Sequence, residues 1–312
     1  MQITATFLDE ISHDIPHQNW GRAEWDADFS HMKAVGIDTV ILIRSGFQRW
    51  LTYPSKVLMQ EEGCYQPPVD LVKMFLELAD SHQMKFYFGL YDSGKYWWKG
   101  DFQKEVDINF KVIDEVWKTY GHHKSFKGWY LTQEISRRTG KVVELYAQLG
   151  RHCKEVSNNL PTFISPWIDG CKAVAAASAT ISKEQSVSIK QHEEEWSQIF
   201  DGIKGAVDAV AFQDGHIDYY QLDDFFLVNK SMADKYGLKC WTNAESFDRD
   251  MPIKFFPIKF EKLRLKLEAA RRAGYDKAIT FEFSHFMSPQ SAYLQAGHLY
   301  DRYKEYLKTL KK

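Results

Sequence analysis

Two glutamates that end apolar segments are the residues of this chain best suited to catalysis. Glu134 closes the run FKGWYLTQE, and Glu245 follows the run CWTNA. A carboxyl group at the end of a buried strand lies where barrels and open α/β folds carry out their chemistry. Two carboxyl groups that face each other across an aromatic cleft can hydrolyse a glycoside, because one protonates the leaving oxygen while the other stabilises or attacks the anomeric carbon. We therefore expect Glu134 and Glu245 to be catalytic residues.

Each of these carboxyl groups also has a plainer interpretation. Glu134 could pair with Arg137 or Arg138 at the rim of the cleft, and Glu245 could cap a helix or a loop. Glu282 stands inside the apolar run AITFEF, where a buried carboxylate must either function or pair with a cation. Glu282 therefore competes with Glu245 as the partner of Glu134.

Polar and aromatic residues at the ends of the other apolar segments form the expected substrate-binding set. These residues are Asp9, Arg44, Tyr91, Asp92, Gln133, Trp167, Gln213, Asp214, Asn243, Glu282 and His285. The amides of Gln133 and Asn243 could hydrogen-bond a sugar hydroxyl, and a ring such as Trp167 matches the C–H face of a pyranose. The set contains a single arginine, which disfavours a phosphate-bearing substrate. Asp214 precedes a glycine, a pair that is also typical of turns.

Alternating strand and helix patterns position these residues. Short β-rich segments recur roughly 30 to 47 residues apart, and each precedes a segment with apolar residues at helical spacing, such as Val106, Phe110 and Ile113. The expected strands span residues 3–8, 37–43, 84–91, 128–132, 162–167, 209–213, 238–243 and 278–283. No linker rich in Pro, Ser or Gly divides the chain. We therefore predict the α/β class, with a single (β/α)8 TIM barrel as one domain over residues 1–312.

Two of the expected loops are long, those after the second and fifth strands. The first covers residues 45–68 and is rich in aromatic residues. The second falls in residues 170–191, which are rich in Ala and Ser and could form a mobile lid or a solvated insertion. Tryptophans in expected loops, such as Trp50, Trp97 and Trp98, are better candidates for stacking on sugars than tryptophans in a core.

The composition excludes several classes of function. Lys and Arg total 40 against 42 Asp and Glu, and the resulting net charge of −2 argues against a nucleic-acid-binding protein. The sequence contains no run of about 18 apolar residues, so we expect no membrane span. The N-terminus lacks a signal-peptide pattern, so we expect a cytoplasmic protein, or a periplasmic or secreted one if a leader has been removed.

The sequence also lacks the usual motifs for cofactors and metals. No G-x-G-x-x-G follows a strand and no P-loop motif occurs, so no nucleotide or other cofactor is expected. The cysteines, which have no disulfide or zinc-site spacing and are expected to be free thiols, are Cys64, Cys153, Cys171 and Cys240. The expected partner is a carbohydrate substrate, and the oligomeric state stays open.

The chain resembles the (β/α)8 glycoside hydrolases of clan A. That clan places its acid/base glutamate at the end of strand four and its nucleophile at the end of strand seven, and Glu134 and Glu245 follow the fourth and seventh expected strands. Gln133 stands where the clan usually has Asn, and its amide is one methylene further from the backbone. More narrowly, the segments GIDTVIL, GWYLTQEIS and FEFSHFMSP resemble a family of glycosyl-hydrolase-like barrels long described as a domain of unknown function, over nearly the whole chain.

The resemblance implies a retaining glycoside hydrolase, but two other functions fit the same residues. A retaining enzyme needs its two carboxyl groups about 5 to 5.5 Å apart, and an inverting one about 6.5 to 9.5 Å. A divalent-metal sugar isomerase or epimerase could draw its ligands from Glu134, Asp169, Asp214, His216, Glu282 and His285. A carbohydrate-binding barrel without catalytic activity would keep the aromatic cleft and would have lost the chemistry.

Overall fold

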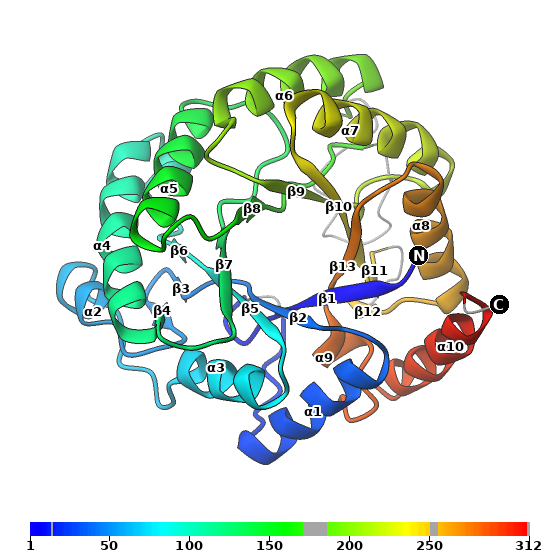
Figure 1. Cartoon of the computed structure of the whole chain (residues 1–312), viewed down its shortest axis with the longest axis horizontal. Coiled ribbons are helices and arrows are strands. Elements are labelled where there is room, and N and C mark those ends of the chain that lie inside the picture. The colour runs from blue at the N-terminus through cyan, green and yellow to red at the C-terminus, as the bar shows by residue number, and fades with distance from the viewer. Residues whose placement is uncertain (14, 171–185, 250–254, 311–312) are drawn as a thin grey trace.

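A closed barrel of parallel strands forms the centre of the molecule (Figure 1). The computed structural model describes residues 1–13, 15–170, 186–249 and 255–310. Within these residues the barrel strands are β1 (Ile3–Leu8), β2 (Thr39–Leu42), β5 (Lys85–Gly89), β7 (Phe126–Leu131), β8 (Thr162–Ile164), β9 (Ala209–Gln213), β10 (Lys239–Glu245) and β13 (Lys277–Phe281). Neighbouring strands pair in chain order, and β13 closes the ring against β1. The predicted TIM barrel is therefore confirmed.

Helices surround the barrel and cover the outer faces of its strands (Figure 1). They are α1 (Arg22–Ala34), α3 (Leu71–Ser81), α4 (Phe102–Tyr120), α5 (Val142–Val156), α6 (Ile189–Ile203), α7 (Leu222–Tyr236), α8 (Phe260–Arg272) and α10 (Leu294–Leu310). Apolar residues at helical spacing explain them, because each helix turns one apolar face onto the sheet. None of the described helices is long and apolar enough to cross a bilayer.

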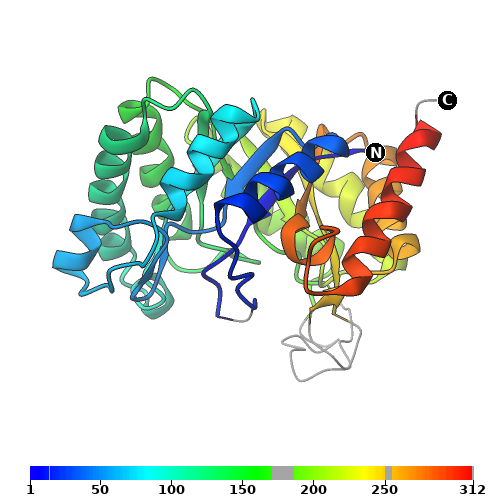
Figure 2. The same cartoon turned by 90° about the horizontal axis from the view of Figure 1, so that it is seen from below.

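The loops after the barrel strands carry short elements of their own. These are β3 (Gly46–Phe47), β4 (Trp50–Leu51), α2 (Lys56–Glu61), β6 (Tyr91–Asp92), β11 (Phe247–Asp248), β12 (Phe256–Pro257), α9 (Phe283–Phe286) and the 3-10 helices η1 (Trp97–Lys99) and η2 (Tyr219–Gln221). The segment that follows β1 projects from the lower side of the barrel in Figure 2. The long loop predicted after the second strand is present and contains β3, β4 and α2.

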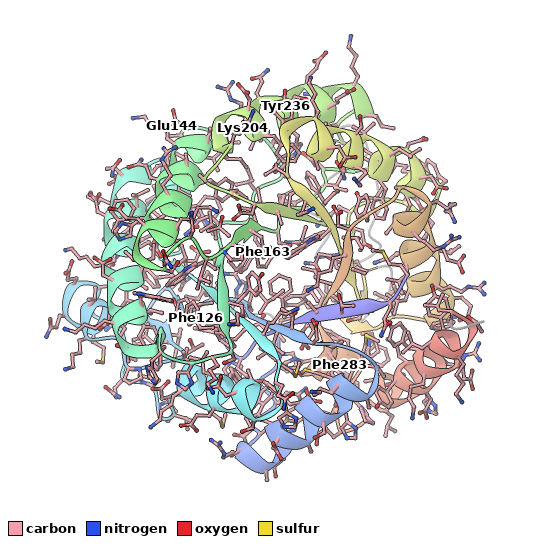
Figure 3. The ribbon with its side chains drawn as sticks, in the orientation of Figure 1. Phe126, Glu144, Phe163, Lys204, Tyr236 and Phe283 are labelled. Atoms are coloured by element: carbon pink, nitrogen blue, oxygen red, sulfur yellow. The ribbon has the colours of Figure 1, made fainter. Side chains whose placement is uncertain are left out.

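Side chains fill the interior of the barrel, so a ligand can only enter at its mouth. Phe7, Ile41, Tyr130, Phe163 and other inward-facing residues form one apolar cluster. The ring centroids of Tyr130 and Phe163 are 4.8 Å apart, and those of Phe7 and Tyr130 are 5.2 Å apart. Figure 3 shows Phe163 among the side chains that crowd the centre of the barrel. A packed interior of this kind is usual for the fold.

The strands expected at residues 278–283 and 162–167 end early, each for a local reason. The predicted strand 278–283 ends at Phe281, because the carboxylate of Glu282 accepts the backbone N–H groups of Ser284 and His285 and caps α9. The predicted strand 162–167 ends at Ile164, shortly before a proline, which has no N–H to donate to the ladder. Of the predicted loop at residues 170–191, the part at 171–185, with Cys171, lies outside the described residues. The other three cysteines are free and buried.

Candidate active site

A pocket of about 260 Å³ opens at the carboxyl ends of the barrel strands. The expected site residues that line it are Arg44, Asp92, Glu134, Trp167, Gln213 and Glu245. They come from the ends of β2, β6, β7, β8, β9 and β10, or from the residues directly after them. Parallel strands all present their carboxyl ends at the same mouth, so the closed barrel brings these distant parts of the chain together.

Glu134 lies against a cation and a phenol. The hydroxyl of Tyr130 donates to its Oε1 at 3.1 Å, and Nη2 of Arg44 lies 3.5 Å from its Oε2. Burial raises the pKa of Glu134, although Arg44 and the hydrogen bond from Tyr130 act in the opposite direction. The carboxyl group therefore holds its proton to a higher pH than an ordinary glutamate.

Arg44 is held in place by groups on three segments. Its Nη1 donates to Oγ of Ser12 at 3.1 Å, and its Nε lies 3.6 Å from Oδ2 of Asp92. Asp9 fixes Ser12 in turn, because its Oδ1 accepts the Ser12 N–H at 2.9 Å. The guanidinium is therefore fixed between Asp92 and Glu134, where it faces the pocket.

Glu245 has the opposite electrostatic environment to Glu134. Arg249 donates to both of its carboxylate oxygens, from Nε at 2.9 Å and from Nη2 at 2.8 Å. Burial would raise the pKa of Glu245, but Arg249 outweighs that effect and, with Lys266 and His216, lowers it to about 2. A paired arrangement of this kind keeps the carboxylate ionised and fixed in direction.

Gly215 makes room for the carboxyl group of Glu245. A Cβ atom built on Gly215 would overlap Cδ, Oε1 and Oε2 of Glu245. Any residue other than glycine at this position would therefore displace the carboxylate from its present place beside Arg249.

A buried ion pair holds the backbone of Glu245. Nζ of Lys266, on α8, donates to Oδ1 of Asp214 at 2.7 Å and to the carbonyl oxygen of Glu245 at 3.1 Å. The same Asp214 oxygen accepts the N–H of Glu245 at 3.2 Å. Both charged side chains are almost fully buried, with exposed fractions of 3% for Lys266 and 0% for Asp214. Asp214 thus supports the pocket from behind and does not line it.

Aromatic rings form much of the remaining pocket wall. Besides Trp167, these are Phe47, Trp97, Trp98, Phe247, Phe255 and Phe281. The indole Nε1 of Trp97 donates to Oδ1 of Asp92 at 3.0 Å, so a polar wall residue orients an aromatic one. Flat apolar rings beside carboxylates suit a sugar, whose faces are apolar and whose edges carry hydroxyls.

The structure directs Tyr91 and Gln133 away from the pocket. The hydroxyl of Tyr91 donates to the carbonyl oxygen of Gln48 at 2.7 Å. The amide of Gln133 donates to the carbonyl oxygen of Tyr91 at 3.0 Å and to Oε1 of Glu105, on α4, at 3.1 Å. Both side chains therefore connect neighbouring strand ends and lie outside the pocket lining.

Asp9 and Asn243 are also buried behind the pocket. Oδ1 of Asp9 accepts backbone N–H groups of Ile11 and Ser12 in the turn after β1. Nδ2 of Asn243 donates to Oγ of Ser165 at 3.1 Å, inside the barrel. Oδ2 of Asp9 and Oδ1 of Asn243 are both buried without a hydrogen-bond partner in the part of the chain that the structure covers.

Glu282 and His285 form a buried pair at one side of the barrel mouth. Oε1 of Glu282 lies 2.5 Å from Nδ1 of His285, whose Nε2 lies 2.6 Å from the carbonyl oxygen of Pro16. Burial lowers the pKa of His285, but Glu282 and Glu10 outweigh it and raise that pKa to about 9. Neither side chain lines the pocket, so the structure brings Glu245, and not Glu282, into the same pocket as Glu134.

The six residues considered as metal ligands do not converge. Glu134 lines the pocket, Asp214 is paired with Lys266, and Glu282 is paired with His285. No group of three or more His, Cys, Asp or Glu side chains suited to a metal occurs among residues 1–13, 15–170, 186–249 and 255–310.

Two cations of the site were not predicted from the sequence. Arg249 stands four residues after Glu245, but that spacing predicts an ion pair only on a helix, and this segment follows a strand. Lys266 left a signal, because it stands three residues after Leu263 and four before Ala270, on the apolar face of α8. A lysine in that position must find a buried acidic partner, and a search for one leads to the strand ends.

Comparisons with known proteins match the chain to one family model and to a highly similar solved structure. A family model described as "Domain of unknown function (DUF4434)" matches residues 3–293. A crystal structure described as a "putative alpha-L-fucosidase" from Bacteroides thetaiotaomicron shares 67% identity, covers 98% of this chain and 95% of its own, and superposes with a TM-score of 0.94. No curated protein sequence matches the chain.

More distant solved structures share the barrel fold. The endo-beta-1,4-mannanase from Thermotoga petrophila is 12% identical, covers 89% of this chain and 67% of its own, and has a TM-score of 0.57. The intracellular xylanase TsXylA from Thermoanaerobacterium saccharolyticum is 13% identical, covers 90% and 85%, and has a TM-score of 0.54. At these identities the likeness concerns the fold alone, which in both cases is that of a glycoside hydrolase.

Proposed function

We propose that this chain, which belongs to the DUF4434 family of domains of unknown function, is a retaining glycoside hydrolase. In this proposal Glu134 is the acid/base and Glu245 is the nucleophile. One observation carries it: both carboxyl groups line one pocket, while their surroundings raise the pKa of Glu134 and lower that of Glu245 to about 2. Divergent pKa values separate the protonated acid from the ionised carboxylate in such a pair, and the resemblance to clan A supports the nucleophilic role of the carboxylate after the seventh strand.

The reaction would proceed in two displacements. Glu134 donates its proton to the glycosidic oxygen while Glu245 attacks the anomeric carbon, which gives a glycosyl ester of Glu245 and the free leaving alcohol. Water then attacks the anomeric carbon, Glu134 takes up its proton, and the Glu245 carboxylate is released. Arg44, 3.5 Å from Glu134, stabilises the carboxylate that Glu134 becomes after the first proton transfer.

An α-L-fucoside is the first substrate to test. The fucosidase description of the 67% identical relative supports this choice. Phe47, Phe247 and Phe281 in the pocket wall add support, because fucose carries a methyl group where most hexoses carry a hydroxymethyl, and apolar rings favour the methyl.

Replacing Glu134 with glutamine tests the acid role. We expect Glu134→Gln to lower turnover of a glycoside with a poor leaving group, such as a methyl glycoside, by about 100-fold or more, since a positioned general acid contributes about that much. With a dinitrophenyl leaving group the loss should be much smaller, because such a group departs without a proton. The measurement is kcat/KM on a panel of glycosides that differ in sugar and in leaving group.

An exposed glutamate serves as the matched control for that substitution. Glu144 lies on the outer surface of α5, away from the pocket, and Glu144→Gln should match the wild type on every substrate. Equal turnover by the wild type and Glu134→Gln on a poor leaving group would contradict the assignment of Glu134.

The pH profile of kcat/KM follows from the two pKa shifts. The free enzyme must hold Glu245 ionised and Glu134 protonated, so activity falls as the pH drops through about 2 and as it rises through the raised pKa of Glu134. We expect a basic limb above the ordinary glutamate range, and its loss in Glu134→Gln. A basic limb that persists unchanged in Glu134→Gln would assign it to another group.

A further inference from the structure

Two exposed aromatic rings lie on the loop that follows β2, outside the lining of the candidate catalytic pocket. The Trp50 side chain is 62% exposed and the Tyr65 side chain 44% exposed. Their ring centroids are 5.1 Å apart and their planes meet at 54°. Large aromatic side chains are normally buried in part or in full, so an exposed pair in contact indicates a surface used for binding.

A hairpin connects these rings to the pocket. In the β3–β4 hairpin Phe47 is paired directly with Trp50, and residues opposite each other in an antiparallel pair share one face. Phe47 lines the pocket, and His13, another lining residue, stacks on its ring at 5.8 Å with an interplanar angle of 17°. Trp50 and Tyr65 therefore lie further along the hairpin face that carries Phe47, outside the pocket lining. We call Phe47, Trp50 and Tyr65 the aromatic track.

The outer end of the track is fixed in place before any ligand arrives. The N–H of Tyr65 donates to the carbonyl oxygen of Arg49 at 2.8 Å, and Nε of Arg49 donates to the carbonyl oxygen of Gly63 at 2.8 Å. The Arg49 guanidinium lies over the Tyr65 ring, 4.2 Å from its centroid. A ring that is already held loses little conformational entropy on binding.

The positions of the exposed rings favour a sugar chain over a protein partner. The exposed aromatic residues Trp50, Tyr65, Trp98 and Tyr220 all lie on loops that follow barrel strands, on the side of the pocket. Among the exposed aliphatic residues of the described chain, Val69 lies on the same loop as Trp50 and Tyr65, whereas Leu227, Leu265, Leu294 and Leu310 lie on the outer helices. The exposed apolar surface on the pocket side is therefore mostly aromatic, which suits stacking on sugar rings better than the mixed aromatic and aliphatic surface of a protein interface.

We propose that the aromatic track binds the sugar residues that follow the cleaved one, so that the substrate is an oligosaccharide or polysaccharide chain. The cleavage part of this statement rests on the proposed function, whereas binding to the track does not. The candidate catalytic pocket, about 260 Å³, takes the reacting end, and the track extends binding along the chain outside it.

The test separates binding to a chain from turnover of a small glycoside. Wild type, Trp50→Ala, Tyr65→Ala and the double variant are run on native gels that contain xyloglucan, galactomannan, arabinoxylan or fucoidan, and kcat/KM is measured on nitrophenyl monoglycosides. We expect at least one polysaccharide to retard the wild type, Trp50→Ala to weaken that binding about tenfold, and monoglycoside turnover to stay unchanged. Trp50→Phe, which keeps a ring, should recover part of the affinity.

The polysaccharide-binding experiment has its own control, and its failure can be told apart from a failure of the proposed hydrolase function. Leu227→Ala removes an equally exposed apolar side chain on α7 and should leave retardation unchanged. Absence of retardation for the wild type in every gel, or equal retardation of wild type and the double variant, would overturn the track. Retardation that depends on Trp50 in a protein that hydrolyses nothing would uphold the track and overturn the hydrolase.

Discussion

Replacing Gly215 with alanine is expected to lower the turnover of every substrate by about 100-fold or more while the protein stays folded. The added methyl group would overlap the whole carboxyl group of Glu245, which must therefore move. Displacing a reacting group by about 1 Å costs on the order of 100-fold in rate. Unlike the loss in Glu134→Gln, this loss should not depend on the leaving group, because the nucleophile itself is displaced.

The cost in stability should be small by comparison. The atoms that the methyl group meets are the end of a flexible side chain, which can rotate away without moving the backbone. The rotation breaks the paired hydrogen bonds from Arg249 to Glu245, so we expect a loss on the order of 1 to 3 kcal/mol in the free energy of unfolding.

A second glycine-to-alanine substitution provides the control. Gly297 lies within α10, where a Cβ atom meets nothing closer than 3.7 Å, so Gly297→Ala should leave activity unchanged and stabilise the helix by about 1 kcal/mol. Activity is measured as kcat and KM on the substrate found in the glycoside panel. If Gly215→Ala retained wild-type kcat, Glu245 would not be the nucleophile.

The barrel was predictable because its strands are buried on both faces and therefore read as continuous apolar runs. β1 and β9 begin and end at the predicted residues. The errors arose at strand ends, where one local interaction outweighs β propensity. Glu282 could not be recognised as a helix cap inside the run AITFEF, because capping depends on backbone angles that the pattern does not reveal.

The sequence predicted where the candidate site lies, but not which side chains at the strand ends face the pocket. Successive residues at a strand end point to opposite sides, so one of two polar neighbours faces the pocket and the other faces away. Asp92, Glu134 and Gln213 line the pocket, whereas their neighbours Tyr91, Gln133 and Asp214 do not. The sequence contains both members of each pair and no feature that selects between them.

Sequence patterns could not predict the cations that lower the pKa of Glu245, for a different reason. Arg249 reaches Glu245 through the folding of one loop, where the four-residue spacing has no predictive value, and Lys266 reaches it through the docking of α8. The electrostatic contrast between Glu134 and Glu245 is therefore a property of the tertiary structure. The resemblance to a family could suggest the two roles, and the folded chain supplies a physical basis for them.

Removing the charge of Asp214 is expected to lower the free energy of unfolding by about 3 to 5 kcal/mol, the largest stability effect among these predictions. Asp214→Asn removes the carboxylate that contacts the buried Lys266 ammonium, and breaking a buried pair on one side costs about that much. Lys266→Met should cost a similar amount, because it leaves the Asp214 carboxylate buried alone. Chemical denaturation curves of the single variants provide the measurement.

The double variant and an exposed pair complete the test. Asp214→Asn/Lys266→Met removes both charges and should be less destabilised than the sum of the single variants, since no unpaired charge remains. Asp223→Asn breaks an exposed pair with Arg272, also a residue of α8, and should cost no more than about 1 kcal/mol. A cost for Asp214→Asn as small as that of Asp223→Asn would contradict a buried ion pair at this place. Since Asp214 and Lys266 hold both the N–H and the carbonyl of Glu245, kcat should fall in the single variants more than KM changes.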